Sequence, residues 1–131
     1  MKWPELFLVF VVAHLFGDYL VQTDWQARHK ARGLSGDRVA RRALCAHVVN
    51  YTLAFVPALA WMGSALGTGI AALTAIALSH LVVDDGRLLL LYLRRVKRCP
   101  DPVPPGLLTS VDQSIHLIVL WLVAVGAAAQ A

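Results

Sequence analysis

Charged residues are scarce in this chain of 131 residues. Asp, Glu, Lys and Arg together make up 15% of it, whereas they make up about a quarter of an ordinary soluble domain. Hydrophobic residues reach 58%, and the mean hydropathy is +0.62. This scarcity of charge excludes an ordinary soluble domain, and the sequence therefore predicts an integral membrane protein.

Cysteine is also scarce, with Cys45 and Cys99 as the two examples. Two isolated thiols form neither a disulfide framework nor a pair with metal-binding spacing, so we assign them no role. A cleavage site of the small-x-small type is missing after the first apolar run. We therefore expect that run to remain in the protein as a membrane span.

Four long apolar segments predict four membrane-spanning helices, because a helix that crosses the hydrocarbon needs about 20 mainly apolar residues. The segments are residues 4–21, 43–62, 65–93 and 107–129. Only the turn MGSALG separates the second from the third, so these two should form an antiparallel hairpin. The sequence thus predicts an all-α fold, a single transmembrane domain over residues 1–131 built as an integral membrane four-helix bundle.

The positive charges are concentrated in two of the connecting segments. Most of the 12 Lys and Arg residues lie there, namely Arg28, Lys30, Arg32, Arg38, Arg41 and Arg42 in one and Arg94, Arg95, Lys97 and Arg98 in the other. With four spans both segments face the same side, and the positive-inside rule makes them two basic cytoplasmic loops with both termini outside. Membrane topology explains the net charge of +4 better than nucleic-acid binding does, so we expect no nucleic-acid partner.

Polar residues recur inside the predicted spans at a regular spacing. Each span has one histidine, and three spans have an aspartate four residues from it. Residues four apart share one face of a helix, so each pair presents two side chains to one point. If the third helix tilts or protrudes, all seven residues lie at one depth in the cytoplasmic half of the bilayer. The seven are His14, Asp18, His47, His80, Asp84, Asp112 and His116.

An aspartate near the middle of a spanning helix costs on the order of 3 kcal/mol to insert. A divalent cation or protonated histidines would offset that cost. We therefore predict that the seven residues are ligands of zinc, manganese or iron, with Asp18, Asp84 and Asp112 as candidate catalytic bases. The spacing leaves two arrangements open, namely two ions, or one ion with aspartates that orient the histidines. Five neighbours are predicted to contact a ligand or the substrate, namely Gln22, Asn50, Asp85, Arg87 and Gln113. Among these, Asp85 is expected to pair with Arg87 or with a loop arginine, and for Arg87 two alternatives stay open, namely snorkelling to the interface and binding a substrate phosphate.

Three stretches carry a family resemblance, namely HLFGDYLVQTDWQARHK, HLVVDD and DQSIH. They resemble a family of small bacterial and phage membrane proteins catalogued as a domain of unknown function, number 3307. The resemblance covers nearly the whole chain and implies a multi-pass protein of the bacterial inner membrane, without implying an activity. The pattern of His and Asp in membrane helices is also similar to that of inner-membrane metal-dependent hydrolases, by analogy only.

The leading hypothesis is a metal-dependent hydrolase that acts on a lipid or lipid-linked phosphate or ester at the cytoplasmic leaflet, where the basic loops hold anionic headgroups. One alternative is a non-enzymatic membrane protein whose His/Asp network is structural. A metal or proton carrier is another, which the apolar outer halves of the helices disfavour. Haem held by two histidines is a third. The sequence leaves the oligomeric state open, a homo-oligomer included.

Overall fold

The computed structural model of the chain describes residues 2–35, 37–61, 63 and 65–130. Within these residues the secondary structure is entirely helical, without a strand. This confirms the all-α prediction.

Four helices are long and apolar enough to cross a membrane. The first joins α1 (Trp3–Leu15) to the π-helix η1 (Phe16–Val21). The others are α3 (Arg38–Trp61), α4 (Leu66–Asp84) and α6 (Pro105–Ala128). Because α3 begins before the predicted residue 43, its first turns include three of the arginines that we had placed in a loop, namely Arg38, Arg41 and Arg42.

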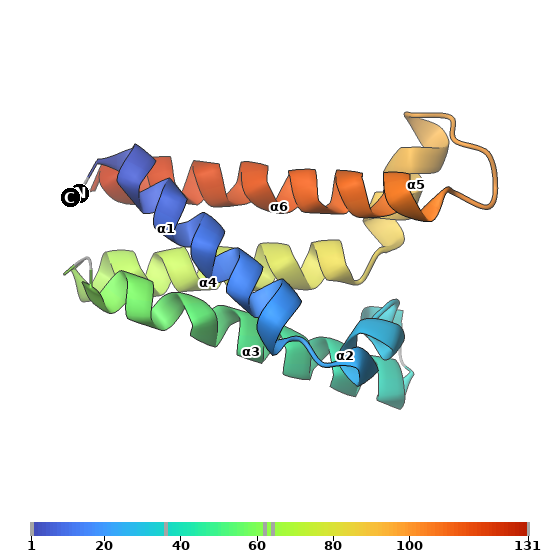
Figure 1. Cartoon of the computed structure of the whole chain (residues 1–131), viewed down its shortest axis with the longest axis horizontal. Coiled ribbons are helices and arrows are strands. Elements are labelled where there is room, and N and C mark those ends of the chain that lie inside the picture. Colours follow the sequence, from blue (N-terminus) through green and yellow to red (C-terminus); the bar gives the residue numbers. More distant parts are fainter. Residues whose placement is uncertain (1, 36, 62, 64, 131) are drawn as a thin grey trace.

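The shorter elements lie at one end of the bundle (Figure 1). They are α2 (Asp24–His29) and the 3₁₀ turn η2 (Gly33–Ser35), which connect η1 to α3, and α5 (Arg87–Arg95), which connects α4 to α6. At the opposite end α1 begins, α6 ends and α3 turns back into α4. The two connections rich in Lys and Arg therefore share one end of the bundle.

The third predicted span was wrong in its extent, because the structure divides residues 65–93 into two helices. Helix α4 ends at Asp84, and Gly86 then adopts a φ of 77° before α5 begins. Glycine suits this left-handed conformation, which costs other residues energy. The break places His80 and Asp84 in the last turns of α4, so neither a tilt nor a protruding helix is needed to bring them level with the other polar residues.

The apolar core occupies the half of the bundle away from α2 and α5. Its buried members are Leu6, Phe10, Ala13, Tyr51, Phe55, Leu59, Ala72, Ile76, Leu120, Ala124 and Ala127. Phe10 and Phe55 meet edge to face with their ring centroids 5.6 Å apart, a favourable arrangement for aromatic rings. This core holds α1, α3, α4 and α6 together on the side of the polar residues that faces away from α2 and α5.

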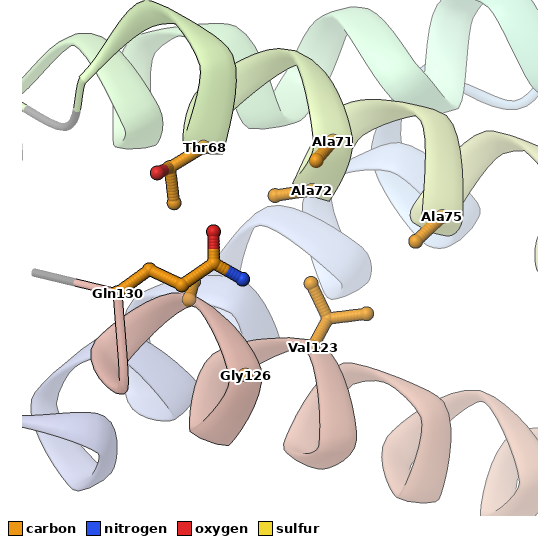
Figure 2. Close-up of a pocket in the computed structure, with 8 residues that line it drawn as sticks. Thr68, Ala71, Ala72, Ala75, Val123, Gly126 and Gln130 are labelled. Carbon is orange, nitrogen blue, oxygen red and sulfur yellow. The ribbon is translucent and has the colours of Figure 1, made fainter.

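A cavity of about 150 Å³ lies at this far end, between α4 and α6. Figure 2 shows that small side chains such as Ala71 and Ala75 line it, with Thr68 and Gln130 as its polar members. None of its lining residues is ionisable. This cavity therefore offers no site for the predicted metal chemistry.

Gly17 sets the distance between η1 and α3. A Cβ atom at this position would lie 2.8 Å from Tyr51 Cδ2 and 3.3 Å from Tyr51 Cα. Any larger residue would therefore push the two helices apart. The close approach carries the neighbouring Asp18 into contact with α3.

Candidate metal centre

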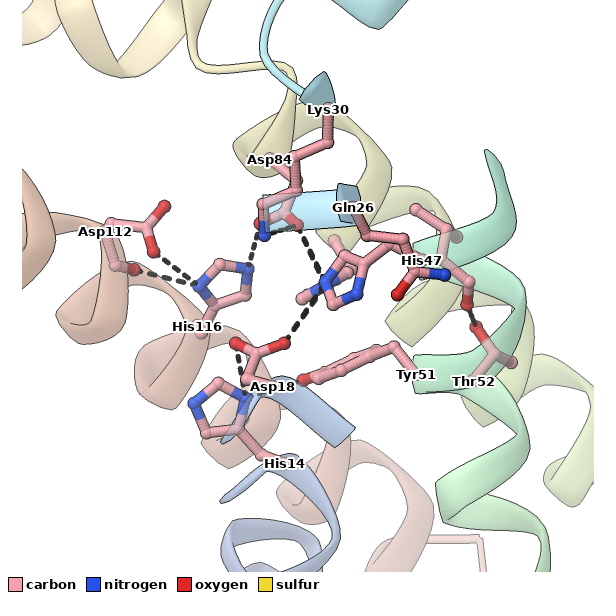
Figure 3. A network of polar contacts seen from close by, with 12 residues as sticks. His14, Asp18, Gln26, Lys30, His47, Tyr51, Thr52, Asp84, Asp112 and His116 are labelled. Carbon is pink, nitrogen blue, oxygen red and sulfur yellow. Dashed lines mark hydrogen bonds and ion pairs between the residues drawn. The ribbon is translucent and has the colours of Figure 1, made fainter. Parts of the chain in front are cut away.

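The seven predicted ligands gather in one layer of the bundle, and Figure 3 labels all of them except His80, which contacts His47, Asp18 and Asp84. They come from all four long helices: His14 and Asp18 from α1 and η1, His47 from α3, His80 and Asp84 from α4, Asp112 and His116 from α6. The four histidines are each at most 4% exposed. The spacing of four residues thus predicted correctly which side chains meet.

Four atoms of this layer, two histidine nitrogens and two carboxylate oxygens, lie close together. His47 Nε2 and His80 Nε2 are 2.9 Å apart. Asp18 Oδ1 lies 3.3 Å and 3.4 Å from these two nitrogens, and Asp84 Oδ2 lies 3.0 Å and 3.2 Å from them. Ligands about 2.0 to 2.1 Å from a tetrahedral zinc ion are about 3.3 Å from one another. These five distances are close to those between the ligands of such an ion, and two triads in the layer could each hold a metal ion, namely Asp18, His47 and His80, and His80, Asp84 and His116.

The contact between the two nitrogens limits the alternatives. Two N–H groups cannot point at each other over 2.9 Å, so His47 and His80 cannot both be imidazolium ions in this position. Among the described residues four buried atoms have no hydrogen-bond partner, namely Asp18 Oδ1, His47 Nδ1, His80 Nδ1 and His116 Nε2. Asp18 Oδ1 belongs to the four-atom set. A cation would satisfy this oxygen and accept lone pairs from both facing nitrogens.

The charges around the centre also leave room for a divalent cation. Asp18, Asp84 and Asp112 contribute three negative charges. Lys30 contributes one positive charge, since its Nζ lies 2.6 Å from Asp84 Oδ2. With neutral histidines two negative charges remain uncompensated, which is costly in a buried site. One divalent ion would neutralise them.

His116 connects the four-atom set to Asp112. Its Nε2 lies 3.5 Å from Asp84 Oδ1, and its Nδ1 lies 3.7 Å from Asp112 Oδ2. The Nδ1 is also 3.0 Å from the Asp112 backbone oxygen. Asp112, whose side chain is 23% exposed, is therefore the most accessible carboxylate of the layer.

His14 lies in the layer, but both of its ring nitrogens have other partners. Its Nδ1 is 2.9 Å from Tyr51 Oη, and its Nε2 is 3.0 Å from Gln113 Oε1. Its distance to Asp18 Oδ2 is 3.6 Å. His14 therefore lies beside the Asp18 oxygen that does not belong to the four-atom set. Both of its ring nitrogens are directed at Tyr51 and Gln113, so neither is available to the four-atom set.

The neighbours predicted to contact a ligand or the substrate divide into two groups. Gln113 contacts the layer, because its amide nitrogen lies 3.2 Å from Asp112 Oδ2 and 3.5 Å from Asp18 Oδ2. With its amide oriented to suit both neighbours, Gln22 donates to the Asp18 backbone oxygen (3.0 Å) and accepts from Lys30 Nζ (2.8 Å).

The second group lies outside the layer. Asn50 is half-buried on α3 and makes no hydrogen bond within the described part of the chain. Asp85 and Arg87 pair with each other, at 2.5 Å between carboxylate and guanidinium, which is one of the alternatives that the sequence left open for these two residues. These two residues belong to the α4–α5 junction.

Sequence reasoning missed the contributions of Lys30 and Tyr51. Lys30 had been counted only as a loop charge. The capping box of Thr23 and Gln26 starts α2, and this short helix returns Lys30 to α4. Tyr51 stacks on His80, with ring centroids 3.5 Å apart and planes 7° apart. It follows His47 by four residues, so the spacing that revealed the other pairs would also have indicated it.

A cavity of about 350 Å³ opens beside the layer on its basic side. Asp84 and Asp112 line it together with Lys30 and Arg32, and apolar residues such as Leu108 make up most of the remaining lining. A ligand with an anionic part and an apolar part can therefore reach the carboxylates from the end that carries α2 and α5.

A family model described as "Protein of unknown function (DUF3307)" matches residues 6–131. No curated protein matches the chain. No solved structure matches it either.

Proposed function

We propose a function from the centre itself, because the chain belongs to the DUF3307 family, whose description names no activity. The protein is a multi-pass membrane protein that binds one divalent cation and hydrolyses a lipid or lipid-linked phosphate or ester. The observation that carries this proposal is the triad of Asp18, His47 and His80 inside four apolar helices, whose ligand atoms lie within 4.8 Å of one another, with Asp84 Oδ2 at 3.0 Å and 3.2 Å from the two histidine nitrogens.

The distribution of charge supports the orientation in the membrane. The connections that contain α2 and α5 share one end of the bundle (Figure 1), and by the positive-inside rule that end faces the cytoplasm of a bacterial cell. The termini then lie on the outer side. The cavity beside Asp84 and Asp112 opens at the cytoplasmic leaflet, where it meets lipid headgroups.

The residues of the layer have distinct proposed roles. His47, His80, Asp18 and Asp84 hold the cation, whose mixed nitrogen and oxygen ligands suit zinc, manganese or ferrous iron. A divalent cation held by these residues would supply Lewis acidity, which lowers the pKa of a bound water molecule and polarises a phosphoryl or carbonyl oxygen.

Asp112 faces the cavity and serves as the general base, and His116 lies between Asp112 and the ligand Asp84. His14, Tyr51 and Gln113 keep Asp18 and the ring of His80 in place.

A structural network is the second candidate, because the contact of Lys30 with Asp84 already compensates one buried charge without a metal. In that case the centre would only hold the four helices together. A carrier needs a polar route through the whole bundle, which Phe10 and Phe55, both 0% exposed, interrupt. The structure therefore supports a carrier less well than a metal-dependent hydrolase or a structural network.

Elemental analysis of the detergent-purified protein tests the proposal. We expect one divalent metal ion per chain, lost in His80→Ala and in Asp18→Asn while both variants remain helical by circular dichroism. His29→Ala is the matched control, because this histidine is exposed, hydrogen-bonds to the Trp25 backbone oxygen and stacks on the Trp25 ring, outside the layer. Absence of metal after loading with zinc, manganese and iron would reject the metal site and favour the structural network.

Hydrolysis is tested separately on the metal-loaded protein. Short-chain lipid phosphates and esters are supplied in detergent, and the release of phosphate or fatty acid is measured. We expect activity that disappears with a chelator and returns with metal. Metal binding without turnover of either class would retain the site and reject the hydrolase.

A further inference from the structure

A second polar cavity lies outside the metal centre, against α5. Its volume is about 290 Å³, and its lining consists of four arginines and two leucines, namely Arg32, Arg87, Leu90, Leu91, Arg94 and Arg95. We call it the arginine pocket. None of its residues contacts the four-atom set, so the centre does not explain it.

The pocket is built by contacts between distant parts of the chain. The backbone N–H of Arg32 donates to the Asp85 backbone oxygen (2.9 Å), and the N–H of Leu34 donates to Asp85 Oδ1 (2.8 Å). These bonds hold the segment after α2 against the junction of α4 and α5. Arg32 itself has a φ of 60°, a conformation that costs a residue other than glycine energy. The fold thus keeps Arg32 beside α5 although its backbone is strained.

The arginines carry more charge than their neighbours compensate. Arg87 pairs with Asp85 (2.5 Å) and Arg94 with Asp101 (2.9 Å). Within the described residues Arg32 and Arg95 have no ion pair. Two positive charges therefore remain in the pocket. A phosphomonoester carries about −1.5 to −2 charges near neutral pH and accepts paired hydrogen bonds from guanidinium groups.

The leucines of the pocket indicate the rest of the ligand. Leu90 and Leu91 line the same cavity as the arginines. Leu88 and Leu91 are 59% and 50% exposed on α5, while Leu89 and Leu93 are buried and fix this helix to the bundle. Because apolar groups stand directly beside the guanidinium groups, the pocket suits a phosphate attached to an apolar chain better than a fully hydrated anion.

We propose that the arginine pocket binds the phosphate group of an amphiphilic phosphomonoester. Arg32 and Leu90 line both this pocket and the cavity beside Asp84 and Asp112. A molecule held by its phosphate at α5 therefore extends toward the metal centre along a shared wall. This last step rests on the proposed hydrolase, whereas phosphate binding in the pocket does not.

Calorimetry in detergent with a chelator present tests the binding alone. The probes are dioctanoyl phosphatidic acid, dioctanoyl phosphatidylcholine and inorganic phosphate. We expect the phosphatidic acid to bind, and the other two to bind at least about tenfold more weakly, because each lacks either the free phosphomonoester charge or the apolar chain. Equal binding of inorganic phosphate would overturn the amphiphile and identify a site for free phosphate. Equal binding of phosphatidylcholine would overturn the phosphate site.

Two variants locate the binding. Arg95→Gln removes a guanidinium that has no carboxylate partner among the described residues, so it leaves the ion pairs of the fold intact, whereas Arg87→Gln removes a lining guanidinium together with its ion pair to Asp85. We expect each to weaken phosphatidic acid binding about tenfold. Arg42→Gln is the control, since it removes one exposed positive charge from α3 outside the pocket.

An equal loss in Arg42→Gln would show a general charge effect, and wild-type affinity in both pocket variants would place the ligand elsewhere. Either result overturns the proposal. Because a chelator is present and metal content is measured separately, failure here is distinguishable from failure of the metal site.

Discussion

Replacement of Lys30 by glutamine distinguishes a metal site from a structural network. The ammonium group lies 2.6 Å from Asp84 Oδ2, and its side chain is 19% exposed. In a purely structural network Lys30 compensates a buried carboxylate, so Lys30→Gln should destabilise the protein by roughly 3–5 kcal/mol, with or without added metal. If Asp84 is a metal ligand, Lys30 instead competes with the cation for the same oxygen, and its removal favours metal binding.

The size of this effect follows from distance. A cation about 2.0 Å beyond Asp84 Oδ2 is at most about 4.6 Å from the ammonium group, given the 2.6 Å contact. The repulsion between a single and a double charge at that distance is about 2 kcal/mol even in bulk water. Lys30→Gln should therefore bind metal about tenfold more tightly or better, and added metal should restore its thermal stability.

The assay combines metal affinity, measured by competition with a chelating dye, and thermal unfolding with and without metal. Arg28→Gln is the control: it removes one positive charge two residues away, from an exposed ion pair with Asp24, and should change neither quantity. An affinity equal to that of the wild type, together with a loss of stability that metal does not restore, would refute Asp84 as a ligand.

Three further substitutions test the support of the centre. Gly17→Ala puts a methyl group 2.8 Å from Tyr51 Cδ2 and should lower the unfolding free energy by roughly 1–3 kcal/mol; Gly67→Ala, whose Cβ meets nothing within 4 Å, should be neutral or stabilising, and equal melting temperatures would contradict this account. Tyr51→Phe removes the hydroxyl 2.9 Å from His14 Nδ1 but keeps the ring on His80, so metal affinity should fall about tenfold, and an unchanged affinity would exclude this support. Asp112→Asn should keep full metal content and lose at least about 100-fold in hydrolysis rate; wild-type turnover would remove Asp112 from the chemistry.

Hydropathy and spacing predicted much of this structure. The apolar segments identified four long helices, and the recurrence of His and Asp every four residues identified the side chains that meet. The break after Asp84 was missed because the chain is apolar on both sides of it, so only the φ of 77° at Gly86 ends the helix. Hydropathy measures composition and does not detect a change in backbone direction.

Spacing also could not show which atoms converge. It places a side chain on a helix face, whereas the rotation of each helix within the bundle decides where its ring nitrogens point. His14 therefore entered the predicted ligand set on the same grounds as His47, although Tyr51 and Gln113 occupy both of its nitrogens. Lys30 lies beyond α2, in a segment without periodicity, so its return to Asp84 depended on tertiary structure.

The wide turn of η1 gives the centre a dependence on chain length. In this π-helix the N–H of Gln22 bonds to the Gly17 oxygen, five residues back, where an α-helix would span four. Asp18 lies within this turn and contacts His47 of α3, and Gln22 directly after the turn bonds to both the Asp18 backbone oxygen and Lys30. Deletion of a single residue in this turn would restore an ordinary helix and preserve the hydropathy of the span. It would also rotate everything after the turn by about 100°. Two chains with the same hydropathy profile would therefore differ in whether Lys30 reaches Asp84 at the end of α4.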